Sequence, residues 1–303
     1  MVKTKNSSYS QIDRQEMKVA YLMLAPAVIC LTLFVIIPVI MAVQKSFYEW
    51  SFYTDSVFVG FNNFRIILVN EYFQQSVINI FKFVIVLVPL NIITTFGFAL
   101  ILKRLSPRAT NVVKSCIYIP GIIAGIIISN VFAIVFNYRA GLLNQLVMAL
   151  GGKRIAFLTN PTWAFWSVVL TSLWSGLGGG TILMYAGIVG IPREHYEAAS
   201  LDGAGAFKQM LYVTIPQMKN ILVLQTISGV SGTLQMLDLP MFLTGGGPLN
   251  KTLTPMLYIY NNFRDRTKTM GYTIAGALLM MILIALINAL VFRLVRSEKT
   301  MDG

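Results

Sequence analysis

Long apolar segments separated by short polar ones dominate the chain. Six stretches of about 20 residues carry no charged side chain, which is about the length of helix that crosses the hydrocarbon core of a bilayer. They run Val19–Val43, Phe83–Leu102, Ser115–Phe136, Trp163–Ile188, Asn220–Leu237 and Gly271–Phe292. Backbone amides find no water partner in lipid, and the alternating ~10-residue pattern of barrel strands is absent. The pattern therefore predicts an all-α membrane protein with six transmembrane helices.

Composition agrees with this prediction and excludes other classes. The 303 residues are 56% hydrophobic and only 12% charged, whereas a soluble chain carries about 25% charged residues. A soluble enzyme and a disordered protein are therefore excluded. The net charge of +12 would suggest nucleic acid on a soluble chain, but here it indicates basic residues at the ends of membrane spans. Cys30 and Cys116 lie in apolar runs, so no disulfide framework is expected.

The distribution of Lys and Arg predicts the orientation in the membrane. Fourteen of the 24 basic residues fall in four segments that one side of the membrane would share. They are Lys3, Lys5, Arg14 and Lys18, then Lys103, Arg104, Arg108 and Lys114, then Arg193, Lys208 and Lys219, and finally Arg293, Arg296 and Lys299. Because basic loops stay inside the cell, both termini are predicted to be cytoplasmic. The chain then consists of an N-terminal tail at 1–18, a six-span domain at 19–293 and a tail at 294–303.

The cytoplasmic segment 191–216, between the fourth and fifth spans, reads as a helical elbow. Pro192 suits a first helical position, and Glu194 places a negative charge in the first turn, where the helix dipole favours it. Gly203 and Gly205 allow the helix to stop with positive φ. A second short helix is expected over Ala206–Tyr212, with Pro216 opening the next span.

The same segment resembles the permease subunits of ABC importers. Glu197-Ala198-Ala199, Gly203 after three residues, and Val213-Thr214-Ile215-Pro216 after nine more are similar to the E-A-A, G, I-x-L-P signature of that family. Val213 and Ile215 are conservative departures from that signature. In the family this loop docks on a cytoplasmic ATPase, and by resemblance Glu197 pairs with a basic residue there. The implied coupling residues are Tyr196, Glu197, Ala198, Ala199, Asp202, Gly203 and Pro216.

Further matches narrow the resemblance to carbohydrate importers of the maltose type, and within it to the first of the two permeases. They are Phe58-Val59-Gly60-Phe61-Asn62-Asn63-Phe64, Gly141-Leu142-Leu143-Asn144, and Asp238 with Leu243-Thr244-Gly245-Gly246-Gly247-Pro248. The resemblance implies a type I importer permease fold in a bacterial or archaeal inner membrane. It also implies a homologous second permease, two cytoplasmic ATPases that bind ATP and Mg, an extracytoplasmic binding protein and a sugar substrate. No cofactor is expected in this chain.

Polar residues inside the spans have two interpretations. They can hydrogen-bond sugar hydroxyls in a water-filled path, or they can join helices to one another, which is the commoner role of a single Ser or Thr. The resemblance places the sugar path on the fourth and fifth spans with help from the third. The implied residues are Gly121, Gly125, Ser172, Trp174, Ser175, Gly176, Gly179, Gly229, Gly232, Thr233 and Gln235. The glycines indicate either a roomy cavity or close helix packing.

Other functions find less support in the sequence. An ion-driven transporter needs carboxylates inside its spans, and Asp238 lies only at an edge. An intramembrane enzyme needs an acid–base or metal set, and His195 has no partner at ligand spacing. A phosphorylated substrate such as glycerol 3-phosphate favours a basic residue in the path, and the span interiors hold none. The sequence therefore predicts a non-enzymatic permease subunit for a neutral sugar.

Overall fold

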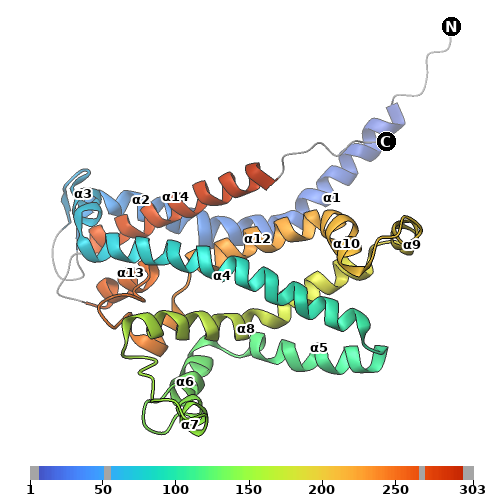
Figure 1. Ribbon diagram of the computed structural model, residues 1–303. Helices are drawn as coiled ribbons and strands as arrows, with labels where there is room; N and C mark the ends of the chain where they lie inside the picture. Colours follow the sequence, from blue (N-terminus) through green and yellow to red (C-terminus); the bar gives the residue numbers. More distant parts are fainter. Residues whose placement is uncertain (1–6, 51–55, 266–269, 296–303) are drawn as a thin grey trace.

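The computed structural model describes residues 7–50, 56–265 and 270–295, and most of this part is helical (Figure 1). The predicted tails at 1–18 and 294–303 therefore lie partly outside the described residues, while 7–18 are already helical. The described residues also form one strand pair that the sequence did not predict. In it β1 (Tyr48–Glu49) pairs antiparallel with β2 (Val57–Phe58).

The helices follow one another in three groups. The first comprises α1 (Ser7–Leu31), the π-helical turn η1 (Thr32–Ile36), α2 (Ile37–Ser46), α3 (Asn62–Val69) and α4 (Glu71–Arg104). The second comprises α5 (Pro107–Ile122), α6 (Gly125–Val135), α7 (Leu142–Ala149) and α8 (Pro161–Val189). The third comprises α9 (Arg193–Leu201), α10 (Ala206–Gln209), η2 (Met210–Thr214), α11 (Ile215–Gln217), α12 (Lys219–Leu234), η3 (Pro240–Thr244), α13 (Pro255–Arg264) and α14 (Met270–Val295).

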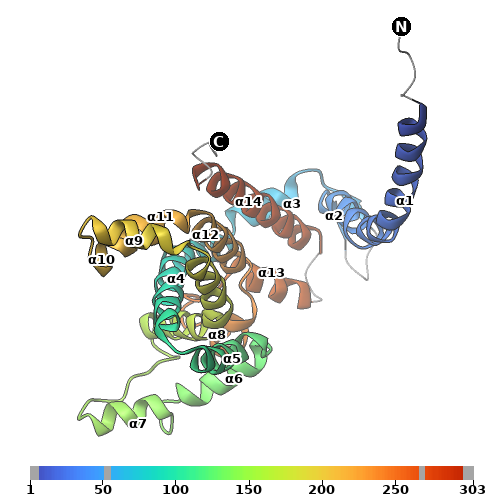
Figure 2. The ribbon, with the colours of Figure 1, turned by 90° about the vertical axis from the view of Figure 1, so that its right-hand side faces the viewer.

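Helices α4, α5, α8 and α12 form the centre of the bundle, and α8 packs against both α4 and α5 (Figures 1 and 2). The main core lies between α4, α8 and α12, where the rings of Phe83 and Phe165 stack at 4.6 Å between centroids. A second core joins α3, α4, α13 and α14 around Ile67 and Leu257. A third, around Met184 and Met218, closes the end of the bundle next to the elbow.

Polar N-caps begin several of these helices at positions that the sequence specifies. Asn70 accepts hydrogen bonds from the backbone of Tyr72 and Phe73 at the start of α4. Ser106, Asn160 and Thr254 cap α5, α8 and α13 in the same way, and a proline follows each of them at the first helical position. Proline is pre-organised for that position and lacks only an N–H that the helix would leave unpaired.

Four of the predicted spans are confirmed as single long apolar helices. Within the described residues these are Glu16–Ser46, Glu71–Arg104, Pro161–Val189 and Met270–Arg293. The third predicted span, Ser115–Phe136, is wrong as one straight helix, because α5 and α6 meet at a bend of 99°. Residues Ile123 and Ala124 are extended at this bend, after Pro120 and Gly121 have weakened the last turn of α5.

The fifth predicted span, Asn220–Leu237, is also shorter than expected. Helix α12 ends at Leu234, and its 16 residues fall below the length of a single spanning helix. The predicted span ran on to Leu237 because Met236 and Leu237 are apolar. Hydropathy carries no information about where the backbone leaves the helix.

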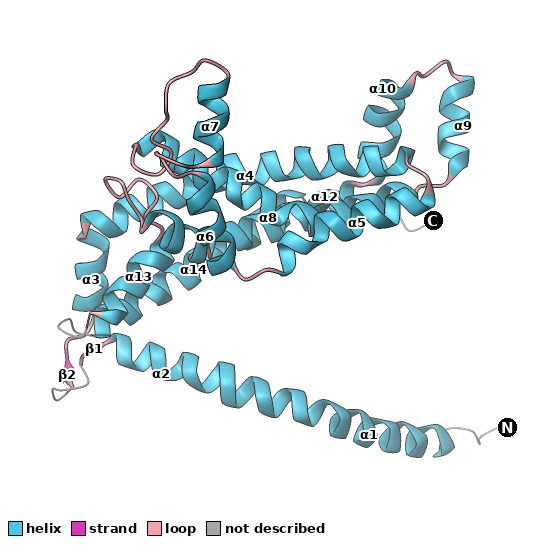
Figure 3. Ribbon diagram, turned by 90° about the horizontal axis from the view of Figure 1, so that it is seen from below, coloured by secondary structure: helices cyan, strands magenta, loops and turns pink. Residues whose placement is uncertain are grey.

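The long N-terminal helix stands apart from the bundle. It diverges from the body toward its amino end, and its carboxyl end reaches α14 and β1 (Figure 3). None of the most apolar stretch of Glu16–Ser46 is buried inside the chain. Asn63 holds the carboxyl end in place by donating hydrogen bonds to the carbonyls of Ser46 and Tyr48, at 2.8 and 3.0 Å.

Segments that the sequence assigned to one side of the membrane gather at one end of the molecule. The carboxyl end of α4, the amino end of α5, the elbow α9–α10 and the carboxyl end of α14 all point the same way, and so does the amino end of α1 (Figure 1). The α3 and β1–β2 segments lie at the opposite end (Figure 3). The end that carries α9–α10 is called the elbow end, and the opposite end is called the α3 end.

Adjacent glycines of α8 provide a test of this packing. A Cβ on Gly178 would lie 2.6 Å from the Cα of Tyr118 in α5, whereas a Cβ on Gly179 would meet nothing within 4 Å. We expect Gly178→Ala to destabilise the chain by about 1–3 kcal/mol through overpacking. Gly179→Ala should leave stability unchanged or raise it by up to about 1 kcal/mol. Thermal unfolding in detergent measures both, and equal midpoints would contradict the close α5–α8 contact.

Candidate functional site

Two parts of the chain concentrate the predicted functional residues. One is the elbow at 191–216, which projects from the bundle (Figure 3). The other is a pair of adjoining cavities between α4, α5, α8 and the end of α12.

The elbow is fixed to the bundle through Tyr196. Its hydroxyl lies 3.1 Å from the hydroxyl of Thr214, and the ammonium of Lys103 stands 4.0 Å from its ring centroid. This cation–π contact links the carboxyl end of α4 to α9. Gln209 ties the two arms of the elbow together, because its amide donates to the Ser200 hydroxyl and to the Ala204 carbonyl, both at 2.9 Å. The motif named Tyr196 as a coupling residue, but nothing in the sequence indicated that Lys103, Thr214 and Gln209 hold the elbow in place.

The turn of the elbow is made by one glycine rather than two. Gly203 has φ of +73°, and the backbone N–H of Ala204 donates to the Ala199 carbonyl as α9 ends. Gly205 is extended at φ −69°, so the prediction of positive φ at Gly205 is wrong. Asp202 is the exposed C-cap residue of α9.

Both prolines of the elbow are displaced from their predicted positions. Pro192 is the residue before the first helical position of α9, which begins at Arg193. Pro216 lies inside α11, and α12 begins only at Lys219, after the buried Met218. The predicted second helix is also divided, with α-helix over Ala206–Gln209 and a π-helical turn after it.

The outer surface of the elbow is exposed and partly apolar. Glu197 and Ala198 are exposed, and Ala199 is half-buried. Leu201 is 90% exposed, and Phe207 and Tyr212 are more than 70% exposed, although each could have been buried had the elbow folded back on the bundle. Exposed apolar side chains gathered on one short segment are typical of a surface that another protein covers.

The two cavities are contiguous. One of about 390 Å³ lies between the α5–α6 bend, α8 and residues 235–239, and one of about 350 Å³ lies between α4, α8 and α12. Ser175, Gly176, Met236 and Leu239 line both. The predicted path residues found here are Gly121, Gly125, Ser175, Gly176 and Gln235 in the first, and Ser172, Ser175, Gly176, Gly229, Gly232 and Thr233 in the second.

Two predicted path residues do not line these cavities. Trp174 is 42% exposed and packs edge-to-face on Phe132 of α6, with ring centroids 5.3 Å apart. Gly179 faces open space on α8. Gln235 borders the first cavity, but its amide turns back and donates to the Ser231 carbonyl of its own helix.

The second cavity contains polar groups from three helices. The amide of Gln225 in α12 donates to the Asn91 side chain of α4 at 2.9 Å. The Oγ of Ser172 in α8 is buried and has no hydrogen-bond partner within the described part of the chain. A buried hydroxyl without a partner costs about 1–3 kcal/mol, so Ser172 places an unpaired polar group in the wall of this cavity. Asn91, Gln225 and Ser228 also line this cavity, and their polarity inside apolar spans is the signal that could have added them to the prediction.

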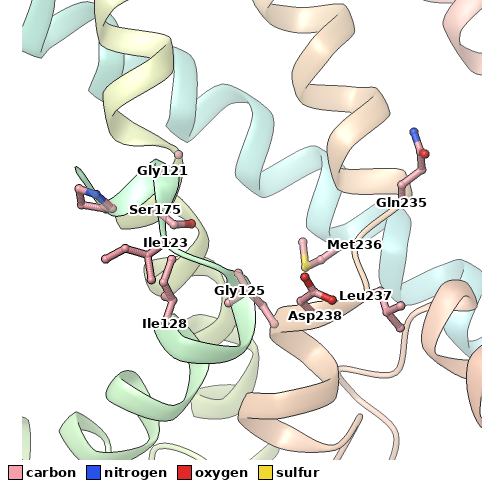
Figure 4. Close-up of a pocket in the computed structure, with 12 residues that line it drawn as sticks. Gly121, Ile123, Gly125, Ile128, Ser175, Gln235, Met236, Leu237 and Asp238 are labelled. Atoms are coloured by element: carbon pink, nitrogen blue, oxygen red, sulfur yellow. The ribbon is translucent and has the colours of Figure 1, made fainter. Parts of the chain in front are cut away.

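The first cavity contains a carboxylate that the sequence placed only at a span edge. The Asp238 side chain faces Gly125 at the start of α6, and a Cβ on Gly125 would lie 2.9 Å from its Oδ2 (Figure 4). A negative charge is stabilised at the amino end of a helix. Asp238 is the one ionisable residue among the twelve that line the cavity, and the lining of the second cavity contains none.

The comparisons with known proteins agree with this architecture. The family model described as "Binding-protein-dependent transport system inner membrane component" matches residues 93–299. The sulfoquinovosyl glycerol transport permease of Agrobacterium fabrum is 31% identical over 292 residues, covering 95% of this chain and 93% of that protein. The trehalose/maltose transport permease of Thermococcus litoralis is 31% identical over 261 residues, covering 85% and 88%.

A solved structure shows the same fold. A chain in the crystal structure of a bacterial ABC transporter involved in the import of the acidic polysaccharide alginate superposes with a TM-score of 0.82. It is 20% identical in sequence, and the match covers 96% of this chain and 99% of that one. The protein described here belongs to the family of binding-protein-dependent transport system inner membrane components. This match confirms the family resemblance that the elbow motif indicated. The protein is a multi-pass membrane protein.

The turn of the elbow provides a matched pair of variants. Gly203 has a left-handed backbone, so an alanine there would cost about 1–2 kcal/mol. Gly205 has an extended backbone that alanine also adopts, so an alanine there carries no such cost. We expect Gly203→Ala to raise amide exchange in residues 196–210 by about five- to thirtyfold. Hydrogen exchange with mass spectrometry measures this, and Gly205→Ala should exchange like the parent. Equal rates in both variants would show that the elbow does not depend on this turn.

Proposed function

We propose that the protein is the permease subunit of an ATP-driven ABC importer for a neutral sugar or oligosaccharide. The single observation that carries the proposal is the exposed elbow bearing the E-A-A motif at one end of a bundle whose polar cavities lie toward its middle. Two relatives, named for transport of sulfoquinovosyl glycerol and of trehalose/maltose, align over nearly their whole length and support a sugar as the substrate.

Six segments would cross the membrane in this proposal, with the elbow end in the cytoplasm. They are the N-terminal helix, α4, α5 with its bent continuation α6, α8, α12 and α14. The gathering of basic residues such as Lys103, Arg104 and Arg108 at the elbow end supports the orientation, because basic residues favour the cytoplasmic side. Both termini are then cytoplasmic.

The chain would supply no catalytic residue. ATP and Mg would be bound by two cytoplasmic ATPase subunits, and the sugar would be delivered by an extracytoplasmic binding protein. A related transporter has been crystallised with an alginate pentasaccharide-bound periplasmic protein, which supports the last of these partners. A homologous second permease would cover the exposed faces of the bundle and close the path. Closure of the ATPases would then move the elbows and open the cavities to the outside in turn.

The charge of the cavities supports a neutral substrate over a phosphorylated one. The only ionisable side chain in their lining is the carboxylate of Asp238, which would repel an anion. The amides of Asn91 and Gln225, which line the second cavity, are groups that hydrogen-bond sugar hydroxyls. The side chains of this half of the path therefore favour a neutral sugar over glycerol 3-phosphate.

Two glutamates of α9 test the coupling role. Both Glu194 and Glu197 are exposed, but only Glu197 belongs to the E-A-A motif. Truncating one partner of a buried interfacial charge pair costs about 2–5 kcal/mol, so Glu197→Ala should lower ATP-driven uptake into proteoliposomes by at least about tenfold. Glu194→Ala should retain uptake. Parental uptake in Glu197→Ala would refute the assignment.

Two open glycines test the path. A Cβ on Gly232 or on Gly97 would meet nothing within 4 Å, but of the two only Gly232 lines either of the two cavities described above. We expect Gly232→Leu to fill the cavity and block uptake of the sugar, while Gly97→Leu leaves uptake unchanged. Uptake and thermal stability are measured together, so that a folding defect is recognised. Full uptake in a stable Gly232→Leu variant would contradict a path through this cavity.

A further inference from the structure

Helix α7 and its flanking loops form a rigid unit beside the bundle. The side chain of Asn144 is buried and donates to the Ile155 carbonyl at 2.9 Å, and its oxygen accepts from the Ile155 N–H at 2.8 Å. The same amide lies 3.3 Å from the carbonyls of Asn137 and Tyr138. One side chain therefore fixes both ends of the segment 137–155 to each other.

The unit lies across the bundle rather than along it. Helix α7 runs across the direction of α4 and α8 and projects away from them, in the half of the molecule away from the elbow (Figures 2 and 3). For a protein whose long helices cross a bilayer, a perpendicular helix lies parallel to the membrane plane. A helix in this orientation can rest in the headgroup layer if its exposed face is apolar.

The exposed face of α7 meets this condition. Leu142, Leu146 and Leu150, each four residues after the last, are 64%, 56% and 80% exposed, and Met148 beside them is 49% exposed. Leu143, by contrast, packs on the core at Phe136 and Phe157. Leu142, Leu146 and Leu150, called the leucine stripe below, therefore face away from the core. The described part of the chain does not cover them.

The charges around the stripe are all positive. Arg139 precedes α7, Lys153 and Arg154 follow it, and all three are exposed. The sequence contains no Asp or Glu between Glu71 and Glu194, so the segment 137–155 contributes only positive charge. Exposed basic residues next to an apolar helix face favour a surface of anionic lipid headgroups.

Aromatic residues mark the same level. Tyr138 comes just before α7 and is 50% exposed, and Trp163 in the first turn of α8 is 42% exposed. Tyr and Trp collect at the boundary between hydrocarbon and headgroups. Three independent features, namely orientation, charge and aromatic flanks, thus agree on this depth.

We propose that α7 is an interfacial anchor whose leucine stripe enters the extracytoplasmic leaflet while Arg139, Lys153 and Arg154 bind anionic lipid headgroups. The anchor would hold the α5–α6 bend, and with it one wall of the first cavity, at a fixed depth. A solute-binding protein is the other partner that could cover this face. The orientation and the aromatic flanks favour the bilayer.

The test measures where α7 lies in the assembled protein. The chain, co-purified with its partner subunits and carrying Cys30→Ser and Cys116→Ser, receives Leu146→Cys labelled with an environment-sensitive fluorophore. Val57→Cys on β2, at the tip of the α3 end, is the control, since Val57 is 60% exposed and far from α7. Both are reconstituted in nanodiscs of phosphatidylcholine with or without phosphatidylglycerol, each with a nitroxide on the lipid headgroup.

We expect a blue-shifted label at Leu146 that the nitroxide lipid quenches, more strongly with phosphatidylglycerol, and no quenching at Val57. Changing Arg139, Lys153 and Arg154 together to Gln should remove the dependence on phosphatidylglycerol. A label at Leu146 that behaves like the one at Val57 would overturn the proposal. So would a label at Leu146 that is shielded from water only after the solute-binding protein is added. Unchanged lipid dependence after the charge removal would overturn the role of the three cations.

ATP-driven uptake is recorded on the same labelled variants reconstituted in proteoliposomes. Loss of uptake with intact quenching bears on the transport function alone, because the anchor does not require any particular substrate.

Discussion

The structure depends on how closely three helices approach α8. Four of the five residues in the run Gly176-Leu177-Gly178-Gly179-Gly180 are glycines, which have no side chain to hold neighbouring helices away. At Gly178 the backbone of α5 touches α8, and at Gly180 a Cβ would lie 2.6 Å from both Thr95 of α4 and Gln225 of α12. In lipid, where no hydrophobic effect drives helices together, such small residues allow the contacts that hold a bundle. The convergence of α4, α5 and α12 on α8 also defines the walls of both cavities.

Much of the fold could be predicted from hydropathy, because four of the six apolar runs lie in single long helices. The errors have a common cause, since apolarity specifies that a segment can lie in lipid but not its direction. Ser115–Phe136 is apolar throughout, yet it turns by 99° after Pro120-Gly121, a pair that marks a break. Helix α12 stops at Leu234 although the next apolar residues would allow it to continue.

The candidate site could likewise be predicted only in part. The elbow could be located from its motif, and most of the implied path residues line the cavities, but side-chain partners could not be predicted. Lys103 reaches Tyr196 across some 90 residues of sequence, and Asp238 reaches Gly125 only because the third span bends. The glycines serve both of the roles that the sequence left open. Gly178 is required for packing, while Gly232 faces open cavity.

The central claim is that this chain works only as part of an ATP-driven assembly. It is tested most directly by tagging the chain in its own operon, extracting it in mild detergent and identifying every co-purifying protein by mass. We expect a second multi-span membrane protein to cover the exposed faces of the bundle and an ATPase to cover the elbow, so both should be recovered. Recovery of the chain alone or as a homodimer, with no ATPase, would contradict it.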